Sequence, residues 1–161
     1  MSLSKTIYVY TDGSSLGNPG PGGWGVYVEA DGTSHCRAGG DTDTTNQRME
    51  LMAAIKALEL FPDAQQAIVH TDSQYVLKGI TEWIHGWKRK GWVNANGRPV
   101  ANRDLWEQLD ERRQDRDIEW VKVKAHIGNP GNEKADALAK LAANDVLDGN
   151  FDRSFDLVAN N

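Results

Sequence analysis

The hydrophobic pattern near the start of the chain predicts a β-strand that ends on a carboxylate. Ile7–Asp12, with the sequence IYVYTD, is rich in β-branched and aromatic residues, and six glycines or prolines follow within Gly17–Gly23. We therefore expect a strand and then a tight turn. Ala67–Asp72 (AIVHTD) has the same character and the same Thr-Asp ending. Because a helical segment separates the two runs, we expect parallel strands whose aspartates share one edge of the sheet.

Three further runs complete a predicted mixed sheet. Trp24–Glu29 has the alternation of a second strand, and the turn signal Asp31-Gly32 returns the chain into Thr33–Gly39. Asp117–Val123 (DIEWVKV) alternates in the same way. The sequence thus predicts a five-stranded sheet, with three antiparallel strands followed by two parallel ones.

Helical periodicity fills most of the remaining chain. Met49–Leu60 carries apolar residues at helical spacing, and the capping-box spacing of Thr44 and Gln47 places the start of this helix at Thr44. Asn102 is expected to cap a later helix that runs to about Gln114. The other predicted helices are Gln74–Gly79, Thr81–Lys90 and Asn132–Asn144. The predicted fold class is therefore α/β, a mixed sheet flanked by helices.

Length and composition limit the organisation and location of the chain. Its 161 residues, 39% hydrophobic, suit one domain over residues 1–161, with a mobile tail at 145–161. Cys36 is the only cysteine, so we expect a half-buried strand residue, no disulfide within the chain and a reducing compartment. The first ten residues hold only four consecutive apolar or aromatic residues, too few for a signal peptide or a membrane span. We expect a cytoplasmic protein without a membrane anchor.

Charge is distributed unevenly along the sequence. The net charge of −5 argues against a nucleic-acid partner, yet Trp83–Arg103 contains no acidic residue and five basic ones, which leaves −5 minus +5, or −10, for the rest. We call Trp83–Arg103 the basic handle. Its cations are Lys88, Arg89, Lys90, Arg98 and Arg103. A concentrated basic segment on an acidic body predicts directed binding of an anionic partner.

Four acidic residues stand at positions where they can converge. Asp12 and Asp72 end strands, while Glu50 and Asp136 lie early in predicted helices. A single glutamate on an amphipathic helix is usually solvated, and 23 acidic residues leave room for coincidence. Position alone therefore leaves both convergence and independent surface placement open.

Several long motifs carry a resemblance to a known family, in the order of that family and from about residue 7 to residue 143. They are Tyr10–Gly23, Thr44–Ala54, Thr71–Val76, Gly79–Trp92, Pro99–Leu109 and Trp120–Ala139. The sequence resembles type 1 ribonuclease H, most of all the stand-alone bacterial enzymes. The resemblance implies a ribonuclease H-like fold and a monomeric endonuclease that hydrolyses the RNA strand of RNA/DNA hybrids. It also implies divalent metal, usually Mg²⁺ with Mn²⁺ as a substitute, and products with 5′-phosphate and 3′-hydroxyl ends.

The resemblance further implies roles for the acids and one histidine. Asp12 would bridge two metal ions, Glu50 and Asp72 would complete one site, and Asp136 the other. Carboxylates suit Mg²⁺ because it prefers hard oxygen ligands. Without metal, clustered carboxylates repel one another and hold protons more readily. His126 would assist proton transfer or product departure, although it lies between Ala125 and Ile127 where the family has smaller neighbours, and an ordinary surface histidine is the alternative.

Substrate contacts also follow from the resemblance. Thr45 matches a DNA-phosphate contact, and a set of amide side chains matches contacts to the minor groove or 2′-hydroxyls. Those side chains are Asn18, Asn46, Gln47 and Gln74, with Gln47 standing where relatives often have asparagine. The handle combines aromatic faces with cations, which is typical of a nucleic-acid groove. Its expected contacts are Trp83, Trp87, Lys88, Arg89, Lys90 and Trp92, together with Trp106 beyond it.

Tryptophans at this spacing are also typical of a helix core, so we expect Trp87 to be partly structural and Trp83 and Trp106 to touch the DNA strand. Two other classes of function remain possible on sequence grounds. One is a hybrid-binding module without catalysis, which the presence of all four acids disfavours. The other is a nuclease of the same fold that cuts DNA.

Overall fold

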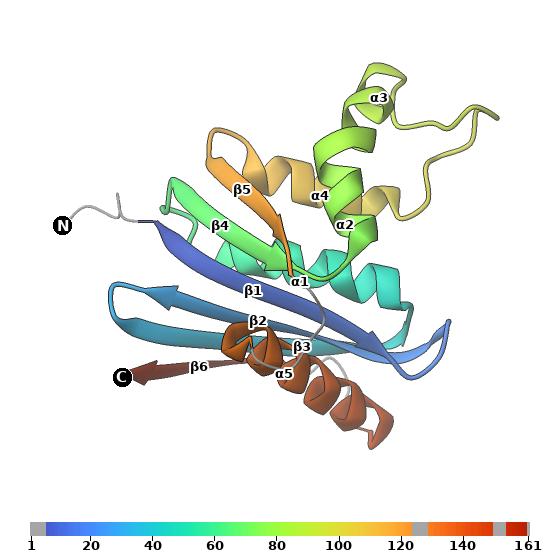
Figure 1. Cartoon of the computed structure of the whole chain (residues 1–161). Helices are drawn as coiled ribbons and strands as arrows, with labels where there is room; N and C mark the ends of the chain where they lie inside the picture. Colours follow the sequence, from blue (N-terminus) through green and yellow to red (C-terminus); the bar gives the residue numbers. More distant parts are fainter. Residues whose placement is uncertain (1–5, 124–128, 150–153, 161) are drawn as a thin grey trace.

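The computed structural model describes residues 6–123 and 129–149, and the main chain of 154–160. Within these residues the chain forms one six-stranded sheet in the order β5-β4-β1-β2-β3-β6 (Figure 1). The strands are β1 Ile7–Ser15, β2 Gly20–Ala30, β3 Thr33–Thr44, β4 Gln66–Thr71, β5 Asp117–Lys122 and β6 Ser154–Asn160. The first three strands are antiparallel, and β4 and β5 run parallel to β1. The five predicted strands and their directions are confirmed.

Three strands are longer than the sequence predicted, and the first of them, β1, continues to Ser15 rather than ending at Asp12. β2 begins at Gly20 rather than Trp24, and β3 continues to Thr44 rather than ending at Gly39. The glycines after Pro19 were expected in a turn, but they pair with β1 and β3 as extended chain. A Cβ on Gly25 would lie 2.4 Å from the carbonyl oxygen of Ala135 in α5, so glycine permits the close approach of that helix.

The stretch predicted as a mobile tail contains ordered secondary structure in its described part. The helix before it extends to Leu147, and Ser154–Asn160 pairs antiparallel with β3 as strand β6. The hydrophobic pattern did not predict this sixth strand, because Phe155 and Leu157 are the only large apolar residues at strand spacing there and Val158 is out of phase with them. Mobility of residues 145–161 stays a prediction.

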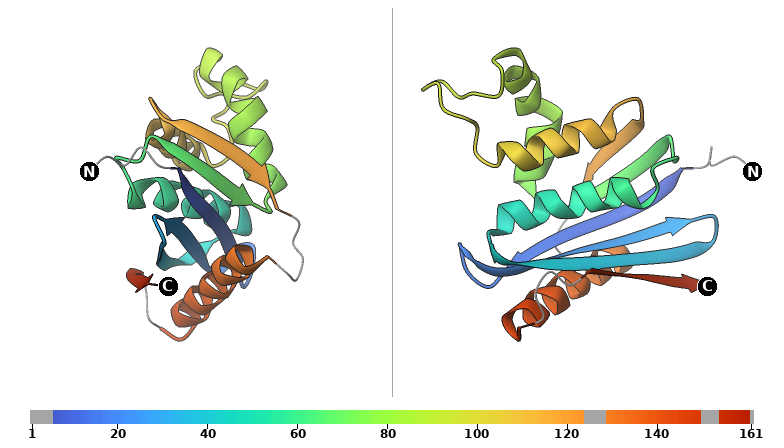
Figure 2. Two further views of the ribbon diagram at one scale, coloured as in Figure 1. Left: turned by 60° about the vertical axis from the view of Figure 1, so that its left-hand side comes forward. Right: turned by 180° about the vertical axis from the view of Figure 1, so that it is seen from behind.

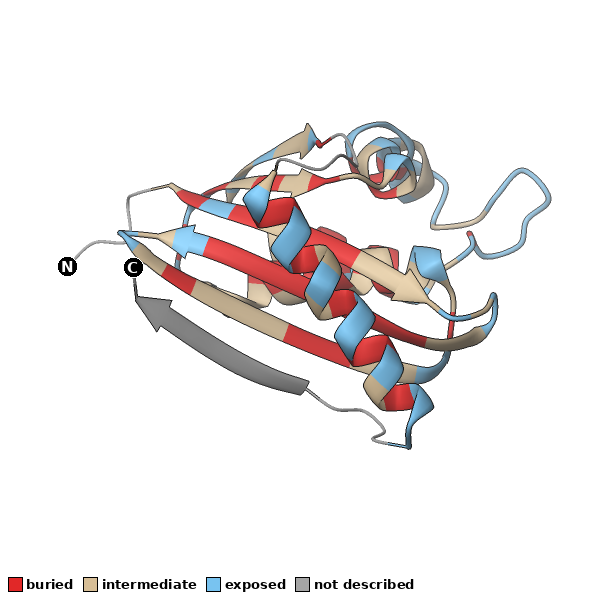
Figure 3. Ribbon diagram, turned by 60° about the horizontal axis from the view of Figure 1, so that its bottom comes forward, coloured by how far each residue is buried: buried red, intermediate tan, exposed pale blue. Residues whose placement is uncertain are grey.

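Helices cover both faces of the sheet (Figures 1 and 2). Their bounds are α1 Asn46–Leu60, α2 Gln74–Lys78, η1 Gly79–Trp83, α3 Ile84–Arg89, α4 Arg103–Arg113 and α5 Pro130–Leu147. α1 and α4 lie on one face, over a core that includes Val9, Val26, Leu51 and Ile55. α5 lies on the other face and turns its buried alanines toward the sheet, while its outer stripe is exposed (Figure 3).

Two predicted helix caps are wrong in detail. The cap of α1 is Thr45, not Thr44, and its hydroxyl accepts a hydrogen bond from the Arg48 amide at 3.2 Å. Thr44 is buried at the end of β3 instead. Asn102 precedes α4 with φ of 58°, a left-handed conformation that asparagine tolerates, and its side chain makes no capping bond. That amide instead donates to the hydroxyl of Tyr75 at 3.0 Å.

The basic handle begins at the end of η1, which follows α2 directly. The chain runs from α2 through the π-helical turn η1 into α3, and with the loop before α4 it projects beyond the sheet (Figures 1 and 2). The two helices predicted here are therefore joined. A Cβ on Gly79 would lie 2.0 Å from the Trp106 ring, so the turn packs directly on that indole. No helix within the described residues is long and apolar enough to cross a membrane.

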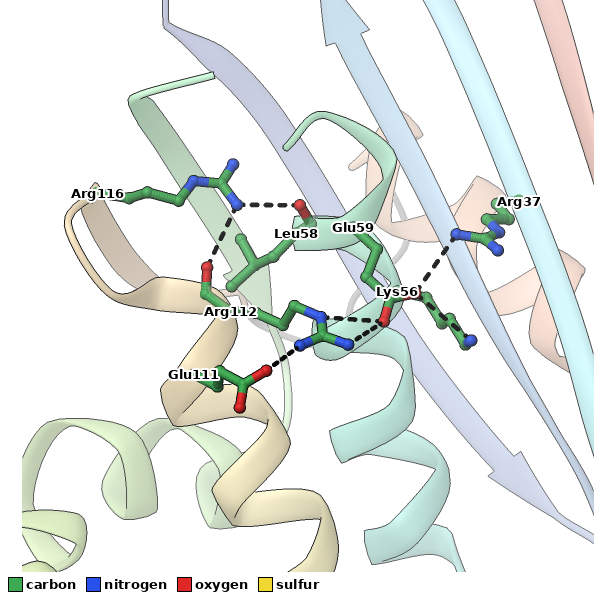
Figure 4. Close-up of polar contacts among 7 residues, drawn as sticks. All are labelled: Arg37, Lys56, Leu58, Glu59, Glu111, Arg112 and Arg116. Carbon is green, nitrogen blue, oxygen red and sulfur yellow. Dashed lines mark hydrogen bonds and ion pairs between the residues drawn. The ribbon is translucent and has the colours of Figure 1, made fainter. Parts of the chain in front are cut away.

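Charged side chains fix α4 against α1 (Figure 4). Glu59 of α1 accepts from Arg112 of α4 at 3.1 Å and lies 3.8 Å from the Arg37 guanidinium of β3. Arg116, in the turn before β5, donates to the carbonyl oxygen of Leu58 at 2.9 Å. This bond satisfies a carbonyl at the C-terminal end of α1, where no intrahelical donor remains.

Candidate active site

Two carboxylates meet where β1 and β4 run side by side. Thr11 pairs with Thr71 in the parallel ladder, so Asp12 and Asp72 are the next residues on the two strands. Both threonines are buried and fix the strand ends: the Thr71 hydroxyl accepts a hydrogen bond from the Ser73 amide at 3.0 Å. The predicted meeting of the two aspartates is confirmed, but Asp12 does not end its strand, because β1 continues to Ser15 and pairs Asp12 with Gly25 of β2.

Glu50 joins them from the second turn of α1. A Cβ on Gly13 would lie 2.4 Å from the Glu50 amide nitrogen, so the glycine after Asp12 lets α1 approach the strand end. The Gly13 amide donates to Asp12 Oδ1 at 2.9 Å and so orients that carboxylate. Asp12, Glu50 and Asp72 each offer one oxygen within 4.8 Å of the others. Because Glu50 lies among these acids and its Oε1 is buried, the alternative of a solvated surface glutamate is excluded.

Asp136 approaches the same cluster from α5. It lies close enough to Asp12 to contribute to the raised pKa of that carboxyl. Lys140, one turn later on α5, lies 3.0 Å from Asp136 Oδ2 and balances part of the charge. Asp136 thus lies beside the group that Asp12, Glu50 and Asp72 form, and the four acids that the sequence singled out come from four separate parts of the chain.

The electrostatics of the cluster follow from burial and repulsion. Burial away from water raises the pKa of Asp12 to about 8, with further contributions from the charge of Asp72 and the hydrogen bond to Asp136. Burial, and then the charge of Asp12, raises the pKa of Glu50 well above its usual range. Burial also raises the pKa of Asp72. As the sequence led us to expect, the site without metal holds protons that isolated carboxylates would release.

These residues fit a divalent cation. Glu50 Oε1 is buried and has no hydrogen-bond partner among the described residues. A buried carboxylate oxygen without a donor is costly unless a cation or a proton compensates it. The donors that surround it are carboxylates, with neither histidine nor cysteine in the group of three. Such hard oxygen donors match Mg²⁺ or Mn²⁺ rather than zinc or copper.

The predicted contact residues of the substrate occupy the same end of the sheet. Asn18 Oδ1 accepts from the Asn46 amide at 3.0 Å, which pins the turn after β1 to the start of α1. Both residues and Gln47 are exposed. Gln74 is exposed too, and its side-chain oxygen accepts from Lys122 Nζ at 2.7 Å. Together they line an accessible polar surface beside the acids.

The tryptophans of the handle are exposed or half-buried, whereas Trp106, which lies beyond it, is buried. Trp83 keeps 40% of its surface exposed, whereas Trp106 is fully buried at 0%. The prediction that Trp106 touches DNA is therefore wrong: its indole packs under Gly79 and donates to the Tyr75 hydroxyl at 3.1 Å. Trp87 is half-buried, 5.2 Å from Trp106 between ring centroids, so its partly structural character is confirmed. Trp92 is half-buried as well.

Comparisons with known proteins agree with this geometry. A family model described as RNase H matches residues 4–144. The chain is 54% identical over 139 residues to the ribonuclease H of Xanthomonas campestris pv. campestris (strain 8004), which covers 86% of this chain and 93% of that protein. The chain belongs to the ribonuclease H family. As a ribonuclease H it is an endoribonuclease, and the family resemblance seen in its motifs is confirmed.

Solved ribonuclease H structures share the fold. LC9-RNase H1, a type 1 RNase H with the type 2 active-site motif, superposes with a TM-score of 0.79 at 33% identity, covering 88% of this chain and 73% of that one. LC11-RNase H1, solved in complex with an RNA/DNA hybrid, has a TM-score of 0.66 at 24% identity, covering 88% of this chain and 99% of the other. The second comparison supports the fold alone.

Some features of this ribonuclease H escaped the sequence analysis, and one lies outside the described residues. His126, with Ala125 and Ile127, falls in the segment 124–128 that the structure does not describe. Arg48 was missed, although it stands two residues before Glu50. Its guanidinium donates two hydrogen bonds, of 3.0 and 2.7 Å, to the Asp104 carboxylate of α4. This ion pair fixes the start of α1 against α4. Its position inside Thr44–Ala54, one of the stretches that carry the family resemblance, was the available signal.

Proposed function

We propose that this ribonuclease H hydrolyses the RNA strand of RNA/DNA hybrids with two Mg²⁺ ions and leaves 5′-phosphate and 3′-hydroxyl ends. The observation that carries the proposal is the convergence of Asp12, Glu50 and Asp72, with the orphaned oxygen of Glu50 among them. Asp12 is buried and Glu50 and Asp72 are half-buried, so divalent cations would compensate the repulsion among the three carboxylates.

The chain's own residues would hold and orient the reacting groups. Asp12 would be shared between two cations, with Glu50 and Asp72 completing one site and Asp136 the other. Two cations, when bound, supply the positive charge that stabilises the attacking and leaving oxygens of a phosphodiester. The Gly13 amide, 2.9 Å from Asp12 Oδ1, fixes the direction of the shared carboxylate. On sequence grounds we assign His126 to proton transfer or product departure.

We further propose that the polar surface beside the acids reads the hybrid. Asn18, Asn46, Gln47 and Gln74 are amides that both donate and accept, which suits the minor groove and the 2′-hydroxyls. The hydroxyl of Thr45 accepts the capping bond of α1 and can still donate to a DNA phosphate. Binding of an RNA/DNA hybrid by the structural neighbour LC11-RNase H1 supports this assignment.

The handle would hold the DNA strand. Trp83 offers an exposed ring, and Lys88, Arg89 and Lys90 offer positive charge. Trp87 and Trp92 are half-buried, so each would contribute only the edge that faces outward. We also propose a monomer that works in the cytoplasm, where a single cysteine would stay reduced.

Digestion of labelled substrates tests the proposal. With Mg²⁺, the wild type should cut the RNA strand of a hybrid and spare double-stranded RNA and double-stranded DNA, and chelation of the metal should stop cleavage. Asp12→Asn should abolish cleavage and keep hybrid binding, because it removes a metal ligand but retains the shape and the bond from Gly13. Asp63→Asn, on the exposed turn after α1, is the matched control and should cut normally.

The outcomes separate the alternatives. Equal cutting of double-stranded DNA would identify a DNA nuclease of this fold. Binding of the hybrid without cleavage at any Mg²⁺ or Mn²⁺ concentration would leave a binding module. Normal turnover by Asp12→Asn would reject the metal scheme.

A further inference from the structure

Two aromatic rings lie directly beneath the acid pair on the same face of the sheet. Tyr10 of β1 pairs with His70 of β4, two residues before Asp12 and Asp72 on their strands. Successive side chains of a strand alternate between faces, so the rings and the carboxylates share a face. The ring centroids are 4.3 Å apart and the planes differ by 12°, which is a close stack.

The stack is tied to the backbone of β1 from the side of β4. His70 Nδ1 lies 2.8 Å from the carbonyl oxygen of Val9. A carbonyl can only accept, so Nδ1 carries the proton and donates it. The imidazole thus spans the two strands and has one orientation, with its flat face against the Tyr10 ring.

Tyr10 also reaches the helix that carries Asp136. A Cβ on Gly131, in the first turn of α5, would lie 2.5 Å from the Tyr10 ring, so the helix start rests directly on that ring. Tyr27 of β2 flanks it with centroids 6.1 Å apart, and Lys134 of α5 lies 4.4 Å above the Tyr27 ring. Asp136 lies five residues after Gly131 on the same helix.

We propose that Tyr10, stacked on His70, is a positioning residue that sets the spacing of Asp12, Asp72 and Asp136. The proposal rests on the proposed function, because it gives these acids a shared task. Tyr10 touches every element that carries one of the three: its own strand, β4 through His70, and α5 through Gly131. Clustered carboxylates repel one another, so a rigid layer beneath them keeps the donor set closed before a cation arrives.

This role is separable from a general role in folding. The main core lies on the opposite face of the sheet, where Val9 and Val69 pack against α1, and Tyr10 is not among its residues. Tyr8 provides a matched control. It precedes Tyr10 by two residues on the same face of β1, but 45% of its surface is exposed. Truncation of either tyrosine removes the same number of atoms from the same strand.

The experiment compares Tyr10→Ala, Tyr10→Phe and Tyr8→Ala with the wild type. Mn²⁺ binding without substrate is measured by calorimetry, and kcat and KM for a labelled hybrid are measured separately. Tyr10→Ala should weaken Mn²⁺ binding by about tenfold, the scale known for residues that orient metal ligands, and lower kcat with little change in KM. Tyr10→Phe keeps the ring and should restore both quantities. Tyr8→Ala should match the wild type.

Other outcomes are decisive as well. If Tyr10→Ala binds Mn²⁺ as tightly as Tyr8→Ala, the proposal is overturned. Should Tyr10→Ala fail to fold, His70→Ala replaces it, since it removes the stack and leaves Tyr10 against Gly131, and the same tenfold loss is expected. Wild-type protein that binds Mn²⁺ but cuts no hybrid would reject the proposed function, while the Mn²⁺ affinities would still decide the role of Tyr10.

Discussion

The carboxyl group of Asp12 is unfavourably placed when no metal is bound, because it is buried among other acids. Asp12 is only 5% exposed, and burial with the charge of Asp72 and the bond to Asp136 raises its pKa to about 8. The sequence located this residue because a β-branched run ended on a Thr-Asp pair and a Gly/Pro-rich turn followed. It could not predict the orphaned oxygen of Glu50, because that depends on how closely α1 approaches Gly13 in three dimensions.

Replacement of Asp12 should stabilise the metal-free protein. The folded pKa is about 8 and the ordinary value is 3.8, so between these values the folded state holds a proton that the unfolded chain has released. Stability is therefore greatest below about pH 4 with respect to this group, and it falls as pH rises toward 8. Asp12→Asn has no ionisable carboxyl at this position, so its stability does not fall in this way as pH rises. At pH 8.5 with chelator it should exceed the wild type by at least about 1.4 kcal/mol, the equivalent of one pKa unit.

Urea denaturation of both proteins at pH 4.5 and 8.5 measures this difference. The gap between variant and wild type should widen with pH, and Asp63→Asn should show no such widening. A gap that stays constant or shrinks as pH rises would mean that Asp12 is ionised at no cost in the folded protein.

At the level of helices and strands, some features follow from the sequence pattern and others follow from tertiary packing. Alternation and β-branched residues predicted the five strands, since a half-buried strand needs that pattern. The spacing of Trp83, Trp87 and Trp92 was ambiguous, because the same period serves a helix core and an exposed groove. The burial of Trp106 is decided by its contact with Gly79, which is remote in sequence. The glycines at the start of β2 were predicted as a turn. The sequence alone does not show that glycine in this strand lets α5 approach the sheet, because that approach depends on tertiary packing.

The three consecutive cations of the handle should contribute unequally to hybrid binding. Lys88 Nζ lies 3.0 Å from Asp110 Oδ2, and the side chain of Asp110 is mostly buried. The positive charge of Lys88 is therefore partly neutralised by this ion pair, which fixes α3 to α4. Arg89 and Lys90 are exposed at the end of α3. Each phosphate contact contributes about 0.9 to the slope of log K against log salt. Arg89→Gln and Lys90→Gln should each lower the slope by about that amount, and Lys88→Gln by clearly less.

Titration of catalytically inactive Asp12→Asn with labelled hybrid at several salt concentrations gives these slopes. Gln is a suitable replacement because it keeps the length and polarity of the side chain. Equal slope changes for all three variants would show that Asp110 does not hold Lys88 away from the substrate.

At the scale of the whole molecule, charge is separated into an acidic body and a basic handle. The net charge of −5 hides +5 in the handle and −10 elsewhere, and part of the latter is concentrated where the three carboxylates meet. One fold therefore presents a surface for phosphates and a separate site for cations. The topology makes this possible, because α2 and η1 separate Asp72 from the handle, which carries positive charge away from the acids.

Metal binding to this fold should be linked to proton release. The raised pKa values of Asp12, Glu50 and Asp72 mean that the metal-free cluster is partly protonated at neutral pH. Carboxylates bind cations in their ionised form, so a cation must displace those protons. Apparent Mg²⁺ affinity should rise from pH 6.5 to 8.5, and calorimetry in buffers of different ionisation enthalpy should detect protons released on binding. Asp12→Asn should release fewer protons than the wild type, whereas Asp63→Asn should release the same number. Affinity that does not change across this range would mean that the acids meet the cation already ionised, and the repulsion inferred from their burial would then have to be relieved by other groups.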